Sequence, residues 1–170
     1  MDIDFLLVKK MRLGDETAIE TFVSKYYPQI LRYCRMHIND YGYAEDMAQE
    51  TFERFFRTLK RYQHYGKAVN YLYVIAANAC KDYYRKHKEI SVEELPEMPA
   101  LNMDLEERID VHMALDGLPV ELREVAILFF LQERKQNDIA RILQIGLPLV
   151  KYRVRKAKDL LSAYIRKEDL

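Results

Sequence analysis

The chain has 170 residues, a mass of 20.3 kDa and equal numbers of basic and acidic residues, 27 of each. This length leaves room for one domain or two small ones and excludes a large multi-domain enzyme. With 49% hydrophobic residues and only five glycines and five prolines, the chain is neither low-complexity nor collagen-like, and it contains no internal repeat. The zero net charge hides strong segregation, because residues 60–88 and 151–167 each carry +6 whereas 89–116 carries −8. Such asymmetry suggests a nucleic-acid partner.

Helical periodicity covers the amino-terminal half, and no stretch alternates well enough to predict a strand. Asp15 is a plausible N-cap for the second predicted helix, in which Pro28 should produce a kink or break. Gly66 separates the third predicted helix from the fourth. The four helices are predicted over 2–13, 15–38, 43–63 and 69–88.

The segment after residue 88 has a different character. Residues 89–103 contain two prolines and several glutamates and show little periodicity, which predicts an acidic linker. Beyond it, helices are predicted over 104–116, from Pro119 in a first turn to about Gln132, and over 135–143 and 147–165. The sequence therefore predicts an all-α protein with a first domain at 1–88, a linker at 89–103 and a second domain at 104–170.

The last two predicted helices are separated by the short turn Gln144-Ile145-Gly146, which is typical of a helix-turn-helix. At 100° per residue, one side of the last helix is apolar, with Val150, Val154, Ala157 and Leu161. The opposite side is basic, a combination that suits the major groove of DNA. A merely solvated cationic helix is the alternative. The candidate DNA contacts are Lys151, Tyr152, Arg153, Arg155, Lys156 and Lys158.

The fourth predicted helix also has an exposed polar side, on which Asn78, Lys81 and Arg85 project away from the apolar stripe. Six of the thirteen tyrosines lie within 60–88, interleaved with cations. Aromatic rings and cations together bind single-stranded nucleic acid, because every base offers a face for stacking. Tyr65 and Tyr71 border the Gly66 break, where a loop could hold an extruded base. Tyr73 and Tyr83 are instead expected to pack in the domain.

The third predicted helix buries Ala48, Phe52 and Phe55 and turns an acidic side outward. Because that side repels DNA, it is a candidate protein-binding surface, with simple solvation as the alternative.

The remaining chemistry-bearing residues point to no active site. Cys34 and Cys80 lie in apolar patterns and are expected to be buried free thiols rather than a redox pair. The four histidines do not pair with them at zinc-site spacing. No Gly-rich phosphate loop or Ser/His/Asp arrangement is present, so neither a cofactor nor a metal is expected. The amino terminus lacks a signal-peptide pattern and no run is long enough to span a membrane, which predicts a cytoplasmic protein without membrane insertion of its own.

Two long motifs carry a family resemblance. The run from Tyr43 to Phe52, YAEDMAQETF, resembles the region 2 signature of bacterial RNA polymerase sigma factors, and the run from Asn70 to Arg85, NYLYVIAANACKDYYR, is similar to the region that follows it. Leu118-Pro119, Asp138-Ile139-Ala140, Ile142-Leu143 and Val150-Lys151-x-Arg153 match the family's second domain. The order and the two-domain layout resemble the compact extracytoplasmic-function (group 4) sigma factors. Tyr71 stands where the family commonly has Trp, and Lys135 where it usually has Ser.

The resemblance implies a non-enzymatic protein that binds core RNA polymerase and promoter DNA, with an anti-sigma factor as a further partner. It implies that the third helix binds core polymerase through Asp46, Gln49, Glu50 and Glu53. It implies that the minus-10 element is recognised and melted by Tyr65, Lys67, Asn70, Tyr71, Asn78, Lys81 and Arg85, and that the last helix reads the minus-35 element. Two alternatives stay open: a helix-turn-helix regulator independent of core polymerase, and an all-helical interaction adaptor.

Overall fold

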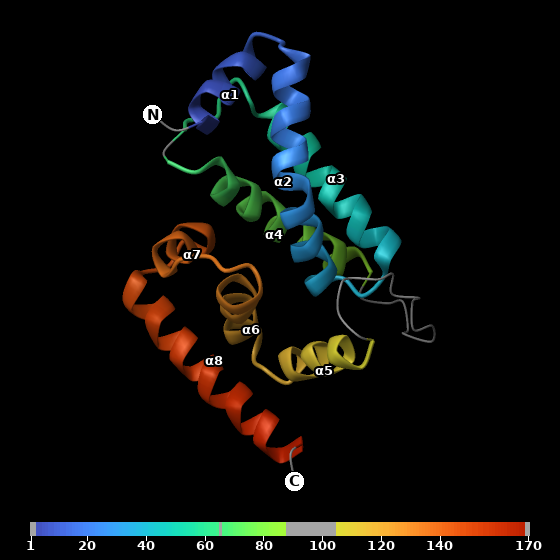
Figure 1. Ribbon diagram of the computed structural model, residues 1–170, viewed down its shortest axis with the longest axis vertical. Coiled ribbons are helices and arrows are strands. Elements are labelled where there is room, and N and C mark those ends of the chain that lie inside the picture. Colours follow the sequence, from blue (N-terminus) through green and yellow to red (C-terminus); the bar gives the residue numbers. More distant parts are fainter. Residues whose placement is uncertain (1–2, 65, 88–104, 169–170) are drawn as a thin grey trace. The chain divides into compact units, whose positions relative to one another are not determined.

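The structure is a computed structural model that describes residues 3–64, 66–87 and 105–168, and every regular element within these ranges is helical (Figure 1). The predicted all-α fold is confirmed. The chain divides into two compact units, Met1–Met98 and Pro99–Leu170. The predicted linker, 89–103, lies outside the described residues. The elements are α1 (Ile3–Arg12), α2 (Glu16–His37), α3 (Tyr41–Arg57), α4 (Ala68–Lys86), α5 (Leu105–Asp116), α6 (Val120–Ala126), the π-helical turn η1 (Ile127–Leu131), α7 (Gln136–Leu143) and α8 (Leu147–Glu168).

The second helix does not break at Pro28. Asp15 caps its start by accepting a hydrogen bond from the Ala18 amide, as predicted, and the helix then continues through Pro28 to His37. Proline removes one backbone hydrogen bond from a helix interior. Phe22 and Ile30, both fully buried, anchor the helix on either side of the proline. Burial of the two halves therefore outweighs the lost bond.

The third helix is shorter than its periodicity predicts. Asp40 accepts a hydrogen bond from the Tyr43 amide and α3 begins at Tyr41, but it ends at Arg57 instead of continuing to residue 63. Leu59 and Tyr62 are nevertheless buried, and the turns after Thr58 bring them inward. The apolar spacing predicted which side chains are buried but not where the helical hydrogen bonds stop.

Aromatic contacts join the helices of the first unit, in which α1 packs on α2, and α2, α3 and α4 pack against one another (Figure 1). The rings of Phe22 and Phe55 stack with centroids 4.9 Å apart and planes 17° apart. Cys34 and Cys80 are both buried free cysteines, as predicted. A hydrogen bond with Cys80, together with burial, holds the pKa of the Cys34 thiol well above its usual range.

The second unit departs from its prediction in the middle of one helix. Pro119 is the N-cap of α6 rather than part of its first turn, and the α-helix gives way after Ala126 to the wider η1 turn. The Gln132 amide donates to the Ile127 carbonyl five residues earlier. All four residues from Val125 to Leu128 are fully buried. Periodicity at 3.6 residues cannot anticipate four consecutive inward side chains.

The helix-turn-helix is present where the sequence predicts it. Gln144 ends α7 in the left-handed conformation, with φ 56° and ψ 46°, and α8 begins at Leu147. The N-cap of α7, Lys135, makes no side-chain capping bond. Ile139 of α7 and Val150, Val154 and Ala157 of α8 are buried, which fixes one side of α8 against the unit.

Candidate nucleic-acid and protein interfaces

The exposed side of α8 is basic. Its side chains opposite the buried stripe are exposed, and Tyr152 keeps 57% of its surface accessible. Among the predicted contacts on α8, only Arg153 is half-buried, which agrees with its position near the edge of the packed side. The exposed members are Lys151, Tyr152, Arg155, Lys156 and Lys158. A helix held on one side and cationic on the other can enter a major groove without disturbing its own packing.

The exposed side of α4 has the composition that the sequence predicts. Asn78, Lys81 and Arg85 are exposed, and Lys67, the N-cap of this helix, is exposed as well. Asn70 is different, because only 8% of its surface is accessible and its side chain belongs to the buried part of α4. Asn70 is the third residue of α4 and lies on its packed side, which contradicts the expectation that its side chain faces DNA. Tyr65 lies outside the described residues.

Tyr71 is half-buried rather than free at a loop edge. Its ring stacks on that of Tyr62, with centroids 5.1 Å apart and planes 24° apart, and contacts Phe55 at 5.9 Å. Its hydroxyl lies 3.4 Å from the Thr58 hydroxyl. One side of the Tyr71 ring is thus held by the segment that follows α3, while part of the residue stays accessible to solvent.

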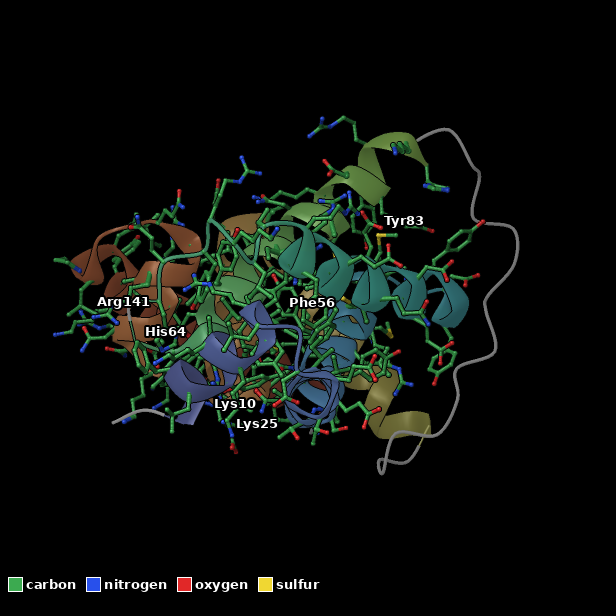
Figure 2. All side chains as sticks on the ribbon, turned by 90° about the horizontal axis from the view of Figure 1, so that it is seen from above. Lys10, Lys25, Phe56, His64, Tyr83 and Arg141 are labelled. Carbon is green, nitrogen blue, oxygen red and sulfur yellow. The ribbon has the colours of Figure 1, made fainter. Side chains whose placement is uncertain are left out.

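A second aromatic group lies at the other end of α4, around Tyr83 (Figure 2). The rings of Tyr83 and His87 stack at 4.2 Å, and Tyr43 from the start of α3 contacts both at 5.2 Å. Burial and the nearby Asp40 carboxylate raise the pKa of the Tyr83 hydroxyl. Tyr83 packs as expected. The i,i+4 spacing of Tyr83 and His87 signals their contact, whereas Tyr43 joins them only through the fold.

The acidic side of α3 is only partly free. Asp46, Gln49 and Glu53 are exposed, but Glu50 is half-buried and accepts hydrogen bonds from Arg54 at 2.9 Å and from Arg57 at 3.2 Å. The hydrogen bond from Arg54 holds the pKa of the Glu50 carboxyl below its usual range, although partial burial opposes it.

The same arginine also reaches a second helix. Arg54 pairs with Asp82 of α4 at 3.2 Å, and Asp82 also pairs with Arg85 at 3.5 Å, as its helical spacing predicts. Glu50, Arg54 and Asp82 therefore form a network that joins α3 to α4. The sequence did not indicate it, because residues 54 and 82 are brought together only by packing.

Across residues 3–64, 66–87 and 105–168, no group of three His, Cys, Asp or Glu side chains is arranged to hold a metal ion. None of the helices in this part of the chain combines the length and the apolar character needed to cross a bilayer.

Comparison with known proteins gives a consistent result. Residues 22–90 match the sigma-70 region 2 family. The chain is 29% identical over 168 residues to the ECF RNA polymerase sigma factor SigE of Mycolicibacterium smegmatis, an alignment that covers 91% of this chain and 65% of that one, less than two thirds of its length. It is 27% identical over 179 residues to the ECF RNA polymerase sigma factor SigW of Bacillus subtilis, covering 94% and 95% of the two chains.

Two solved structures share the fold. CnrH, in complex with the cytosolic domain of CnrY, superposes with a TM-score of 0.80 at 21% identity over 98% of this chain and 99% of that chain. The sigma factor RpoE of Bartonella quintana, in complex with the anti-sigma factor NepR, has a TM-score of 0.74 at 21% identity over 87% and 96%. Residues 22–90 therefore belong to the sigma-70 region 2 family, and over nearly its whole length the chain is similar to extracytoplasmic-function RNA polymerase sigma factors.

Proposed function

We propose that the two units divide promoter recognition: Met1–Met98 binds core RNA polymerase and opens the minus-10 element, and Pro99–Leu170 reads the minus-35 element. The observation that carries this proposal is the placement of cations. On both α4 and α8, exposed polar and cationic side chains lie opposite a buried apolar stripe. Each helix thus offers DNA a surface that its own unit supports.

In the second unit, Tyr152, Arg155 and Lys156 lie opposite the packed stripe of α8 and would face the floor of the major groove. Lys151, Arg153 and Lys158 lie nearer its edges and would meet phosphates. Phosphate contacts position a protein on DNA, whereas contacts with base edges discriminate between sequences.

In the first unit, Asn78, Lys81 and Arg85 would contact bases and backbone of the minus-10 element, with Lys67 at the start of the same helix. The accessible part of Tyr71, together with Tyr65, would stack on or enclose unpaired bases of the non-template strand. Unstacking a base costs a few kcal/mol, and binding the exposed base offsets that cost.

Core polymerase would bind the acidic side of α3, through Asp46, Gln49, Glu50 and Glu53. Its partner surface is then basic. Because Glu50 is already paired with Arg54 and Arg57, and Glu53 with Arg57 at 4.0 Å, the exposed Asp46 would supply most of the attraction.

Joining two modest DNA contacts through polymerase explains how a chain with no net charge can select promoters, since tethering supplies a high effective concentration. We place this activity in the cytoplasm and assign the chain no enzymatic reaction of its own. An anti-sigma factor is the further partner that we propose.

The test is a reconstitution with the full chain. Core RNA polymerase, with and without the chain, is offered duplex DNA randomised over a promoter-sized window, and the transcribed molecules are sequenced. We expect initiation to require both proteins and to enrich two separated sequence blocks. Enrichment of one duplex site by the chain alone, with no effect of core polymerase, would instead support a regulator that acts independently.

A further inference from the structure

The helix α1 holds the segment that leaves α3. Its Arg12 guanidinium donates through Nε to the Leu59 carbonyl at 3.0 Å and through Nη2 to the Tyr62 carbonyl. The segment, residues 58–64, passes beside α1 in the first unit (Figure 1). These are contacts between residues 47 and 50 positions apart in the sequence, so they depend wholly on the fold.

Arginine is well suited to this position. Residues beyond Arg57 have left the α-helix, and carbonyls past a helix end need partners other than the regular ladder. A guanidinium presents several donors in a rigid planar fork that can reach two separate carbonyls at once, whereas a lysine ammonium carries its three donors on one nitrogen at the end of a flexible stem. Arg12 thereby fixes the spacing between α1 and two points of the 58–64 segment.

Three further contacts hold α1 in place. Phe5 lies two turns before Arg12 on the same side of α1. Its ring centroid is 6.4 Å from that of His64, and the His64 Nδ1 lies 2.9 Å from the Tyr62 hydroxyl. The neighbouring Asp4 is 3% exposed, pairs with Lys25 of α2 at 3.0 Å and accepts a hydrogen bond from Tyr26. Because these contacts fix α1 to α2, the hydrogen bonds from Arg12 hold residues 58–64 in place relative to the packed helices of the unit.

The held segment in turn orients Tyr71. Tyr62, whose carbonyl Arg12 binds, stacks its ring on that of Tyr71, and Thr58 lies 3.4 Å from the Tyr71 hydroxyl. We propose that Arg12 is a positioning residue for minus-10 recognition: it holds the 58–64 segment so that Tyr62 and Thr58 present Tyr71 to the unpaired base. The inference rests on the minus-10 role proposed above for Tyr71.

The first measurement needs no DNA. The full chain and its Arg12→Ala, Arg12→Lys and Lys10→Ala variants are treated with trypsin, and cleavage after Lys60 and Arg61 is timed by mass spectrometry. Loss of the paired carbonyl contacts should speed cleavage there about tenfold in both Arg12 variants, because proteolysis follows local opening. Lys10 is exposed on the same helix (Figure 2) and its removal deletes the same charge, so Lys10→Ala should cleave like the parent chain. Unchanged cleavage in Arg12→Ala would overturn the inference.

The second measurement uses holoenzyme assembled on core RNA polymerase. Its affinity is compared for a single-stranded oligonucleotide carrying the selected minus-10 bases and for one with those bases changed. In both Arg12 variants this discrimination should fall about tenfold, while affinity for core polymerase and preference at the minus-35 element stay unchanged. A general folding defect would reduce those two properties as well. If Arg12→Lys kept the full discrimination between the two oligonucleotides, the inference would be overturned. Arg12 would then act through its positive charge on a DNA phosphate, because lysine keeps that charge. Faster cleavage with unchanged discrimination would also overturn it. A parent holoenzyme that shows no base preference would overturn the minus-10 role itself, and the inference with it.

Discussion

Replacing Tyr71 by alanine separates a base contact from a packing contact, because the structure gives its ring both kinds of surface. The substitution removes a half-buried ring, together with its stack on Tyr62 and its contact with Phe55. The matched control is Tyr71→Phe, which keeps the ring and removes only the hydroxyl that lies 3.4 Å from Thr58. At that distance the hydrogen bond is weak.

The two effects have different expected sizes. Truncating a fully buried aromatic residue costs about 3–5 kcal/mol, so a half-buried one should lower the free energy of unfolding by about 2 kcal/mol. Loss of one base–aromatic stack should weaken binding of the open strand by about 1–3 kcal/mol, or roughly 5- to 150-fold. Tyr71→Phe should stay within about 0.5 kcal/mol of the parent chain on both scales.

The assay compares open-complex formation on a duplex promoter and on the same promoter with a pre-melted bubble, both at saturating holoenzyme and well below the melting temperature of the variant. We expect Tyr71→Ala to lose most of its activity on the duplex and little on the bubble, because the bubble removes the cost of unstacking. Equal losses on the two templates would refute the base-contact role and leave Tyr71 as a packing residue. Thermal unfolding of each variant measures the packing part independently.

Four other results are expected. Asp46→Lys should lower core-polymerase affinity about tenfold in a binding titration without moving the melting temperature, because its exposed charge acts through complementarity; unchanged co-purification would contradict this. Glu50→Gln should lower the free energy of unfolding by at most about 1 kcal/mol at pH 7. Because the folded-state pKa of Glu50 is lowered, the difference in unfolding free energy between Glu50→Gln and the parent chain should disappear in urea titrations as the pH falls through that pKa. Arg155→Ala should relax base preference at one or two minus-35 positions whereas Lys158→Ala should weaken binding evenly, so identical preferences in selected promoters would refute the assigned facing of α8. Ile139→Ala should destabilise the second unit by about 2–5 kcal/mol in denaturant unfolding, because its side chain is fully buried.

Several features followed from local sequence alone. The structure contains the Asp15 cap, the short turn ending at Gly146 and the buried stripe of Val150, Val154 and Ala157. Each depends on residues within a few positions of one another, where helical geometry fixes which side chains share a side. The family resemblance rests on similarly local runs, so it too could be read without the fold.

Helix ends and hydrogen-bond patterns were less predictable. The spacing of Leu59 and Tyr62 continues the helical period although α3 ends at Arg57, and the run from Val125 to Leu128 conceals the η1 turn. Apolar spacing reports burial, and burial can be satisfied by turns or a π-helical turn as well as by an α-helix. Asn70 shows the converse, since a polar residue that looks available for DNA is buried at the start of α4.

By itself the sequence determined the all-α class, the two-part layout of its patterns, the basic sides of α4 and α8 and the similarity to sigma factors. Only the tertiary structure decided that Arg12 holds the carbonyls of Leu59 and Tyr62, that Arg54 joins Glu50 to Asp82, and that Tyr71 is stacked rather than free. The physical reason is distance along the chain: hydrogen bonds, ion pairs and ring stacks between residues far apart in sequence leave no periodic trace, and they exist only after the helices have packed.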